Sequence, residues 1–242
     1  MKAGNANPII IDFDPFTSAI NQTLELGASL NISDGRIFRF ASAGTAGSLL
    51  ATHAQQAANP KSNHVYQTAS AIPTGTLTIN LTLGATAAVA NEYVEGIISF
   101  DAGQDYKISS QPAIATGAAG TITVFEAITT AITTANKYSL VHNNFNGTIE
   151  GNSGTPNRAT GIPLTNVAVS NYYWSQTRGT TSCLITGTPA TGSMLTLTTV
   201  TGSLAPITGT FGTAIPPVVG YYDLTATTGG TGQVLPIHLT ID

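Results

Sequence analysis

The fold class is decided by the stretch Thr76-Leu77-Thr78-Ile79-Asn80-Leu81-Thr82-Leu83. Polar and apolar residues alternate along it with a period of two, which is the pattern of a β-strand with one buried and one solvated face. Threonine suits such a strand because its branched β-carbon favours extended backbone and its hydroxyl can face water. The stretch therefore predicts a half-buried strand.

Similar runs recur along the rest of the chain, separated by short glycine-rich turns. They are Val94–Phe100, Tyr106–Ser109, Thr121–Phe125, Tyr138–His142, Leu195–Val200, Val218–Leu224 and Val234–Ile241. The Asp34-Gly35 turn between apolar segments predicts a hairpin over Leu30–Phe40. Only Ser48–Ala58 and Glu126–Ala135 have a spacing compatible with a helix. We predict an all-β protein with a β-sandwich or barrel-like body.

The chain divides into an N-terminal arm and a β-rich body. The run Pro8–Phe16 is apolar and bracketed by prolines, which favour extended backbone, so residues 1–26 are expected to form an extended arm. This arm either docks on a neighbouring subunit or adds an edge strand to the body. Residues 143–163 are rich in Gly and Asn and predict a junction. We expect a first lobe over 27–145 and a second over 146–242, or one continuous β domain.

Charged residues make up only 8% of the chain, whereas threonine is roughly one residue in six. Soluble monomers usually carry a mixed, charged surface and guard exposed strand edges with charges. Either uncharged polar side chains solvate this protein, or an assembly covers much of its surface. Composition leaves both interpretations open.

Charge and cysteine content exclude several classes of function. The net charge of −4 and the lack of a basic cluster argue against nucleic-acid binding. No apolar run approaches the roughly 18 residues that span a membrane, and Cys183 has no disulfide partner in the chain. Because Met1–Asn5 lacks the apolar core of a signal peptide, we expect synthesis in a cytoplasm.

The sequence lacks the familiar patterns of catalytic and metal sites. It contains no Gly-x-Ser-x-Gly elbow and no phosphate-binding loop, and Cys183 lies in a predicted strand, where a buried thiol is inert. Glu92 and Glu95, like Asp101 and Asp105, are interpreted as strand-end and turn residues. Metal-ligand spacing is absent among the four histidines, His53, His64, His142 and His238. We expect no enzymatic activity, no cofactor and no metal.

Three stretches carry a resemblance to a known family. The first is Ile32–Phe40, the second runs from Leu83 through Asn91-Glu92-Tyr93 to Pro112, and the third comprises Gly161–Leu164, Tyr172–Gly179, Pro217–Tyr221 and Leu239–Asp242. In these stretches the chain resembles the head decoration (cement) proteins of tailed bacteriophages, particularly those of cyanophages and marine phages. The matching residues span most of the chain and are structural in character.

The resemblance implies a virion protein on the capsid exterior that binds the major capsid protein and itself, as a homotrimer or similar oligomer. The expected anchors of the arm are Ile9, Ile10, Ile11, Phe13 and Phe16. Trp174 and Arg178 are candidate interface residues because both types are enriched at binding hot spots, although Trp174 equally suits a core position.

Two other functions fit the same residues. A phage tail or fibre component would share this composition, but a fibre shaft would show stricter repeats than this chain has. A carbohydrate-binding β module would use exposed aromatic side chains on a sheet face. The candidates for that role are Tyr66, Tyr172-Tyr173-Trp174 and Tyr221-Tyr222.

Overall fold

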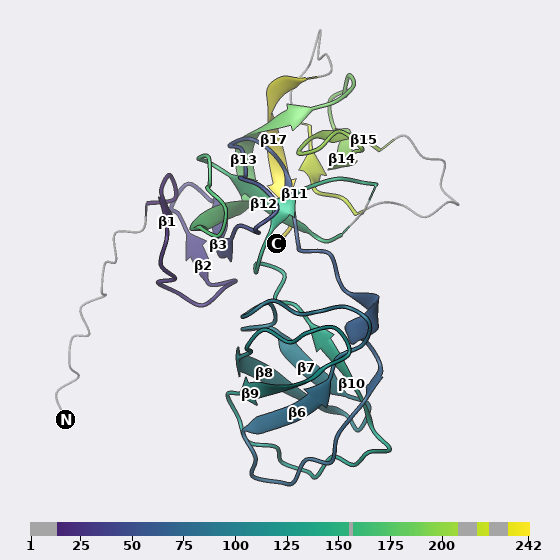
Figure 1. Cartoon of the computed structure of the whole chain (residues 1–242). Helices are drawn as coiled ribbons and strands as arrows, with labels where there is room; N and C mark the ends of the chain where they lie inside the picture. The colour runs from purple at the N-terminus through teal and green to yellow at the C-terminus, as the bar shows by residue number, and fades with distance from the viewer. Residues whose placement is uncertain (1–13, 155–156, 208–216, 223–231) are drawn as a thin grey trace, which may run out of the picture.

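The computed structural model describes residues 14–154, 157–207, 217–222 and 232–242. These residues form β-strands joined by turns, with one short 3-10 helix, η1 (Ser62–His64), and no α-helix among them. The prediction of an all-β fold is confirmed. Figure 1 shows two β lobes, which we call the barrel lobe and the curled lobe, connected by two passes of the chain.

The barrel lobe contains residues from both ends of the chain. Its eleven-stranded sheet combines the early strands with the late ones. The strands are β1 (Ser18–Ala19), β2 (Ser29–Asn31), β3 (Ile37–Ser42), β4 (Gln55–Gln56), β11 (Ile149–Glu150), β12 (Ala159–Pro163), β13 (Tyr172–Ile185), β14 (Met194–Leu197), β15 (Leu204–Pro206), β16 (Gly220–Tyr221) and β17 (Gln233–Thr240).

Strand β13 organises this lobe because it is fourteen residues long and pairs along both edges. One edge pairs with β3 over Tyr172–Arg178 and then with β17 over Arg178–Ile185. The other edge pairs with β1, β12 and β15. A bulge between Gln176 and Arg178 marks the change from β3 to β17, and bulges increase the local bend and twist of a strand.

The two halves of β13 have different burial because they lie in different surroundings. Residues 173–177 are all buried, as in a strand covered on both faces. From Arg178 onward exposed and buried residues alternate, as in the wall of a barrel. This second half closes a five-stranded barrel in the order β13-β15-β14-β16-β17, with β17 pairing back to β13.

The barrel is filled by apolar side chains, most of them aliphatic. Its core consists of Ala54, Ala159, Ile162, Cys183, Ile185, Leu195, Leu197, Leu204, Val219, Tyr222, Ile237 and Leu239. Gly161 of β12 permits the close contact with β13, since a β-carbon there would lie 2.4 Å from the carbonyl oxygen of Gln176. Its φ of +123° also disfavours any residue with a side chain.

The curled lobe is formed by residues 61–142. Its six-stranded antiparallel sheet has the order β5-β10-β7-β8-β9-β6 and curls around one core (Figure 1). The strands are β5 (Gln67–Thr68), β6 (Thr78–Thr82), β7 (Ile97–Phe100), β8 (Gln104–Ser110), β9 (Ala119–Val124) and β10 (Lys137–Val141). In β6 exposed and buried residues alternate, with Ile79 and Leu81 facing the core, as its sequence predicts.

An aromatic layer packs the N-terminal part of the chain onto β13. The predicted hairpin over Leu30–Phe40 is confirmed, since β2 pairs antiparallel with β3. Phe38, Phe40 and Trp174 are buried together with Leu26, and the rings of Phe40 and Trp174 meet edge to face at 5.3 Å. Burial of these large side chains holds residues 24–40 on the barrel lobe.

Strand pairing divides the chain differently from the predicted boundaries of 27–145 and 146–242. Residues 29–42 and 55–56 belong to the barrel lobe because β3 and β4 pair with β13 and β12, so the curled lobe is an insertion within the other. The two expected helices are wrong. Residues 48–58 form a bridge at Leu49, a turn at 51–52 and β4, and residues 126–135 form bends, a turn and a bridge at Ile132. Both segments bury some of their apolar residues, but these residues do not form the continuous apolar face that a helix would need.

Candidate functional site

The two lobes meet at a polar joint built from side chains that lie far apart in the sequence. The chain enters the curled lobe near Lys61 and leaves it near His142, and the turn 89–96 of that lobe is hydrogen-bonded to Asn146 of the barrel lobe. We call this the interlobe joint. Its residues are Gln22, Leu26, Lys61, Glu92, Tyr93, Glu95, His142, Asn143 and Asn146.

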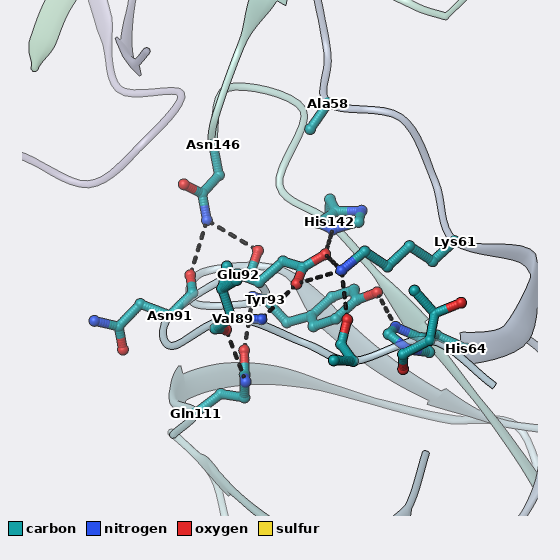
Figure 2. A network of polar contacts seen from close by, with 12 residues as sticks. Ala58, Lys61, His64, Val89, Asn91, Glu92, Tyr93, Gln111, His142 and Asn146 are labelled. Atoms are coloured by element: carbon teal, nitrogen blue, oxygen red, sulfur yellow. Dashed lines mark hydrogen bonds and ion pairs between the residues drawn. The ribbon is translucent and has the colours of Figure 1, made fainter. Parts of the chain in front are cut away.

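Glu92 connects the points where the chain enters and leaves the curled lobe (Figure 2). Its carboxylate lies 2.7 Å from Nζ of Lys61 and 3.1 Å from Nε2 of His142, and it accepts a hydrogen bond from the backbone N–H of Val89. Burial raises the pKa of this carboxyl, but the hydrogen bonds from His142, Lys61 and Val89 outweigh burial and lower the pKa to about 2. Glu92 is therefore an anion at neutral pH. It forms an ion pair with Lys61 and accepts hydrogen bonds.

Two histidines pack against Tyr93 beside this carboxylate. Nε2 of His64 lies 2.7 Å from the carbonyl oxygen of Thr86, which only accepts hydrogen bonds, so Nε2 carries the proton. Nδ1 of the buried His64 then accepts from the Tyr93 hydroxyl at 2.5 Å. The Tyr93 ring stacks on His142 with centroids 4.3 Å apart. Burial, with the nearby Glu92 charge, raises the pKa of Tyr93 well above its ordinary value.

Two asparagines link the lobes through backbone carbonyl groups. Nδ2 of Asn146 donates to the carbonyl oxygens of Asn91 at 3.2 Å and Glu92 at 3.1 Å (Figure 2). Nδ2 of Asn143 donates to those of Leu26 at 3.1 Å and Glu95 at 3.3 Å. Hydrogen bonds to carbonyl oxygens are directional, so these amides fix the turn 89–96 against the barrel lobe.

The N-terminal segment also contacts the curled lobe. The Glu95 carboxylate accepts hydrogen bonds from the backbone N–H of Leu26 and from Nε2 of Gln22. Lys107 of β8 forms an ion pair with Glu25 at 2.9 Å. Residues 22–26 therefore connect the N-terminal part of the chain to the curled lobe.

A polar groove of about 240 Å³ lies beside the joint and draws on both lobes. Its lining residues are Gln22, Leu26, Asn91, Val94, Ser109, Asn146 and Tyr172. No Lys, Arg or His is among them. The groove is therefore lined mainly by amide and hydroxyl groups.

The predicted interface residues do not form one site. Ile9, Ile10, Ile11 and Phe13 lie outside the described residues. Phe16 is 56% exposed, ahead of β1, and Arg178 is exposed on β13. Trp174 is only 5% exposed and packs in the aromatic layer, so it occupies the core position that the sequence left as the alternative.

The interlobe joint was not found from the sequence. Glu92 was interpreted as a strand-end residue, and no local spacing connects it to Lys61 or His142. Only the pairing of β10 with β7 brings His142 back beside the turn that carries Glu92. The one sequence signal was the cluster of Asn residues at 143, 144 and 146, interpreted as a loop.

Cys183 is buried in the barrel core, and burial raises the pKa of its thiol to about 12. Because the thiolate is the nucleophile that attacks thiol reagents, we expect no reaction of the folded protein with a thiol-reactive dye at neutral pH. Full reaction is expected in denaturant, measured as dye released with time. Rapid labelling without denaturant would contradict this placement.

Among the described residues, no three His, Cys, Asp or Glu side chains are grouped so that they could hold a metal ion. Within the same residues, no helix has the length and apolar content needed to cross a membrane. Comparison of the chain with protein-family models, curated proteins and solved structures finds no significant match.

Proposed function

We propose that this chain is a non-enzymatic virion protein that decorates and stabilises a phage capsid by binding the outer surface of the major capsid protein. The observation that carries the proposal is the exposed apolar surface of the N-terminal segment. Phe16 and Ile20 are 56% and 80% exposed on either side of β1, which is hydrogen-bonded to β13. Phe16 is the last residue of the apolar run Pro8–Phe16, and Ile20 follows it four residues later.

The body supports this segment from two sides. β1 joins it to the barrel lobe, while the contacts of Leu26 and Glu25 join it to the curled lobe. An apolar anchor contributes most to affinity when the residues next to it are already ordered, because less conformational entropy is then lost on binding. A capsid-binding protein with such an anchor stabilises the assembled lattice by mass action, because it binds the lattice and not the dissociated subunits.

The low charge of the chain supports the same role. With 8 basic and 12 acidic residues in the whole sequence, the surface offers little electrostatic repulsion to neighbouring copies. We extend the proposal to a homotrimer as the bound form. Size-exclusion chromatography with light scattering measures this, and a monomer at working concentration would contradict it.

Deleting residues 2–16 is expected to abolish co-sedimentation with DNA-emptied heads of the encoding phage, because the apolar anchor is lost. The deletion leaves β1 and everything after it, so far-ultraviolet circular dichroism and the unfolding midpoint should stay close to those of the full chain.

The matched control is Val141→Ser, which removes a half-exposed apolar side chain from the curled lobe and should not affect sedimentation. Immunogold labelling of particles separates the head from the tail as the location. A deletion mutant that is folded and still pellets with heads would refute the anchor, and labelling confined to tails would refute the capsid location.

A further inference from the structure

The interlobe groove has hydrogen-bonding groups that the protein itself does not use. The side-chain amide of Asn91 and the hydroxyl groups of Ser109 and Tyr172 have no hydrogen-bond partner among the described residues. Figure 2 shows the Asn91 amide directed away from the hydrogen-bonded network around Glu92. From this groove we propose a further function: it binds an uncharged saccharide unit.

Two irregularities of the backbone lie in the lining of the groove, and a third, at Glu95, lies beside it. Asn91 and Glu95 are non-glycine residues with φ of +63° and +60°, in the left-handed region. Ser109 lies at the bulge of β8, between Ile108 and Ser110, where pairing with β9 shifts register. Positive φ at such residues costs free energy, and bulges redirect side chains, so both gather at functional sites. Here they occur at Asn91 and Ser109, whose polar side chains line the groove.

The chemistry of the lining favours a neutral polyhydroxylated ligand. Amide and hydroxyl groups both donate and accept hydrogen bonds, as the hydroxyl groups of a sugar do. None of the described residues that line the groove is cationic, and the Glu95 carboxylate beside it repels anions. At about 240 Å³ the groove is smaller and more polar than sites for drug-sized molecules, which suits a single sugar ring.

The aromatic ring of Tyr172 gives the groove one apolar wall. It stacks on Phe40 with centroids 5.8 Å apart and an interplanar angle of 8°, so its orientation is fixed by the aromatic layer. Leu26 and Val94 add further apolar surface for the C–H face of a sugar. Because Asn91 belongs to the curled lobe and Tyr172 to the barrel lobe, a bound sugar would contact both lobes. This inference is independent of capsid binding.

The test is a titration of the labelled full chain with glucose, galactose, mannose and N-acetylglucosamine in turn, followed by two-dimensional amide NMR spectra. At least one sugar should shift the resonances of Asn91, Ser109 and Asn146 in a saturable way at millimolar concentration. Glucuronate, the anionic counterpart of glucose, should bind more weakly than glucose at neutral pH.

Two substitutions remove single groups from the groove without removing its walls. Asn91→Gly deletes the amide where glycine accepts the positive φ, and Tyr172→Phe deletes only a hydroxyl. Each should weaken binding about tenfold. Asn80→Ala, an exposed residue of β6 outside the groove, should bind like the unmodified chain. The proposal is overturned if no sugar shifts these resonances, or if binding survives both substitutions unchanged.

Discussion

Replacing Trp174 with alanine is expected to lower the free energy of unfolding by about 3–5 kcal/mol, the cost of removing a large buried aromatic side chain. Trp174 is 5% exposed and packs with Leu26, Phe38 and Phe40 in the layer that holds the N-terminal part of the chain on β13. Its loss leaves a cavity beside Leu26, Phe38 and Phe40 and removes the edge-to-face contact with Phe40. The substitution should therefore also loosen residues 24–40.

Equilibrium unfolding in urea measures this change. It is monitored by far-ultraviolet circular dichroism, a backbone signal that does not require the tryptophan. The control is Arg178→Ala on the same strand, where the side chain is exposed and the expected change is within about 0.5 kcal/mol. Arg178→Ala should instead be compared in the head-binding assay, since an exposed arginine is available to a partner. An unfolding free energy of the Trp174→Ala protein close to that of the unmodified chain would contradict the core placement.

The second large effect is expected at Glu92 and depends on pH. Its pKa in the folded protein is about 2, against an ordinary value of 4.5, so the folded state favours the charged form. A lowered pKa contributes stability above pH 4.5 that is lost as pH falls toward 2. With allowance for solvent screening, the contribution at neutral pH is about 2 kcal/mol. Glu92→Gln should remove most of it.

The measurement is the unfolding free energy of both proteins near neutral pH and near pH 3, since the difference between them should shrink as the carboxylate is protonated. Glu126→Gln is the control because Glu126 is exposed and has no ion pair among the described residues. A difference between the Glu92→Gln and unmodified proteins that is the same at both pH values would show that Glu92 does not act through its charge.

Much of the fold follows from local pattern. The alternation over Thr76–Leu83 predicted β6, and the Asp34-Gly35 turn predicted the β2-β3 hairpin. Both predictions succeed because a half-buried strand and a tight turn depend on the types of residues adjacent in sequence. The run Tyr138–His142 likewise corresponds to β10 within one residue at each end. The expected helix over 126–135 failed because its threonines and short apolar spacing suit turns that cover the core.

The candidate sites were beyond sequence reasoning. The joint forms because Lys61, Glu92 and His142 converge from three segments, and the groove because Asn91 meets Tyr172 across two lobes. No local rule relates residues fifty or eighty positions apart in sequence.

Local sequence pattern is enough to predict an all-β chain, the positions of most of its strands, and an apolar N-terminal run unlike the body. These properties depend on the alternation and turn chemistry of adjacent residues, which act over a few positions. Only the tertiary structure decided that β13 would pair with both ends of the chain, that Trp174 would be core, and that residues 61–142 would form an inserted lobe. The physical reason is that a strand edge offers the same backbone groups to any partner, so the choice among partners depends on packing of the whole chain.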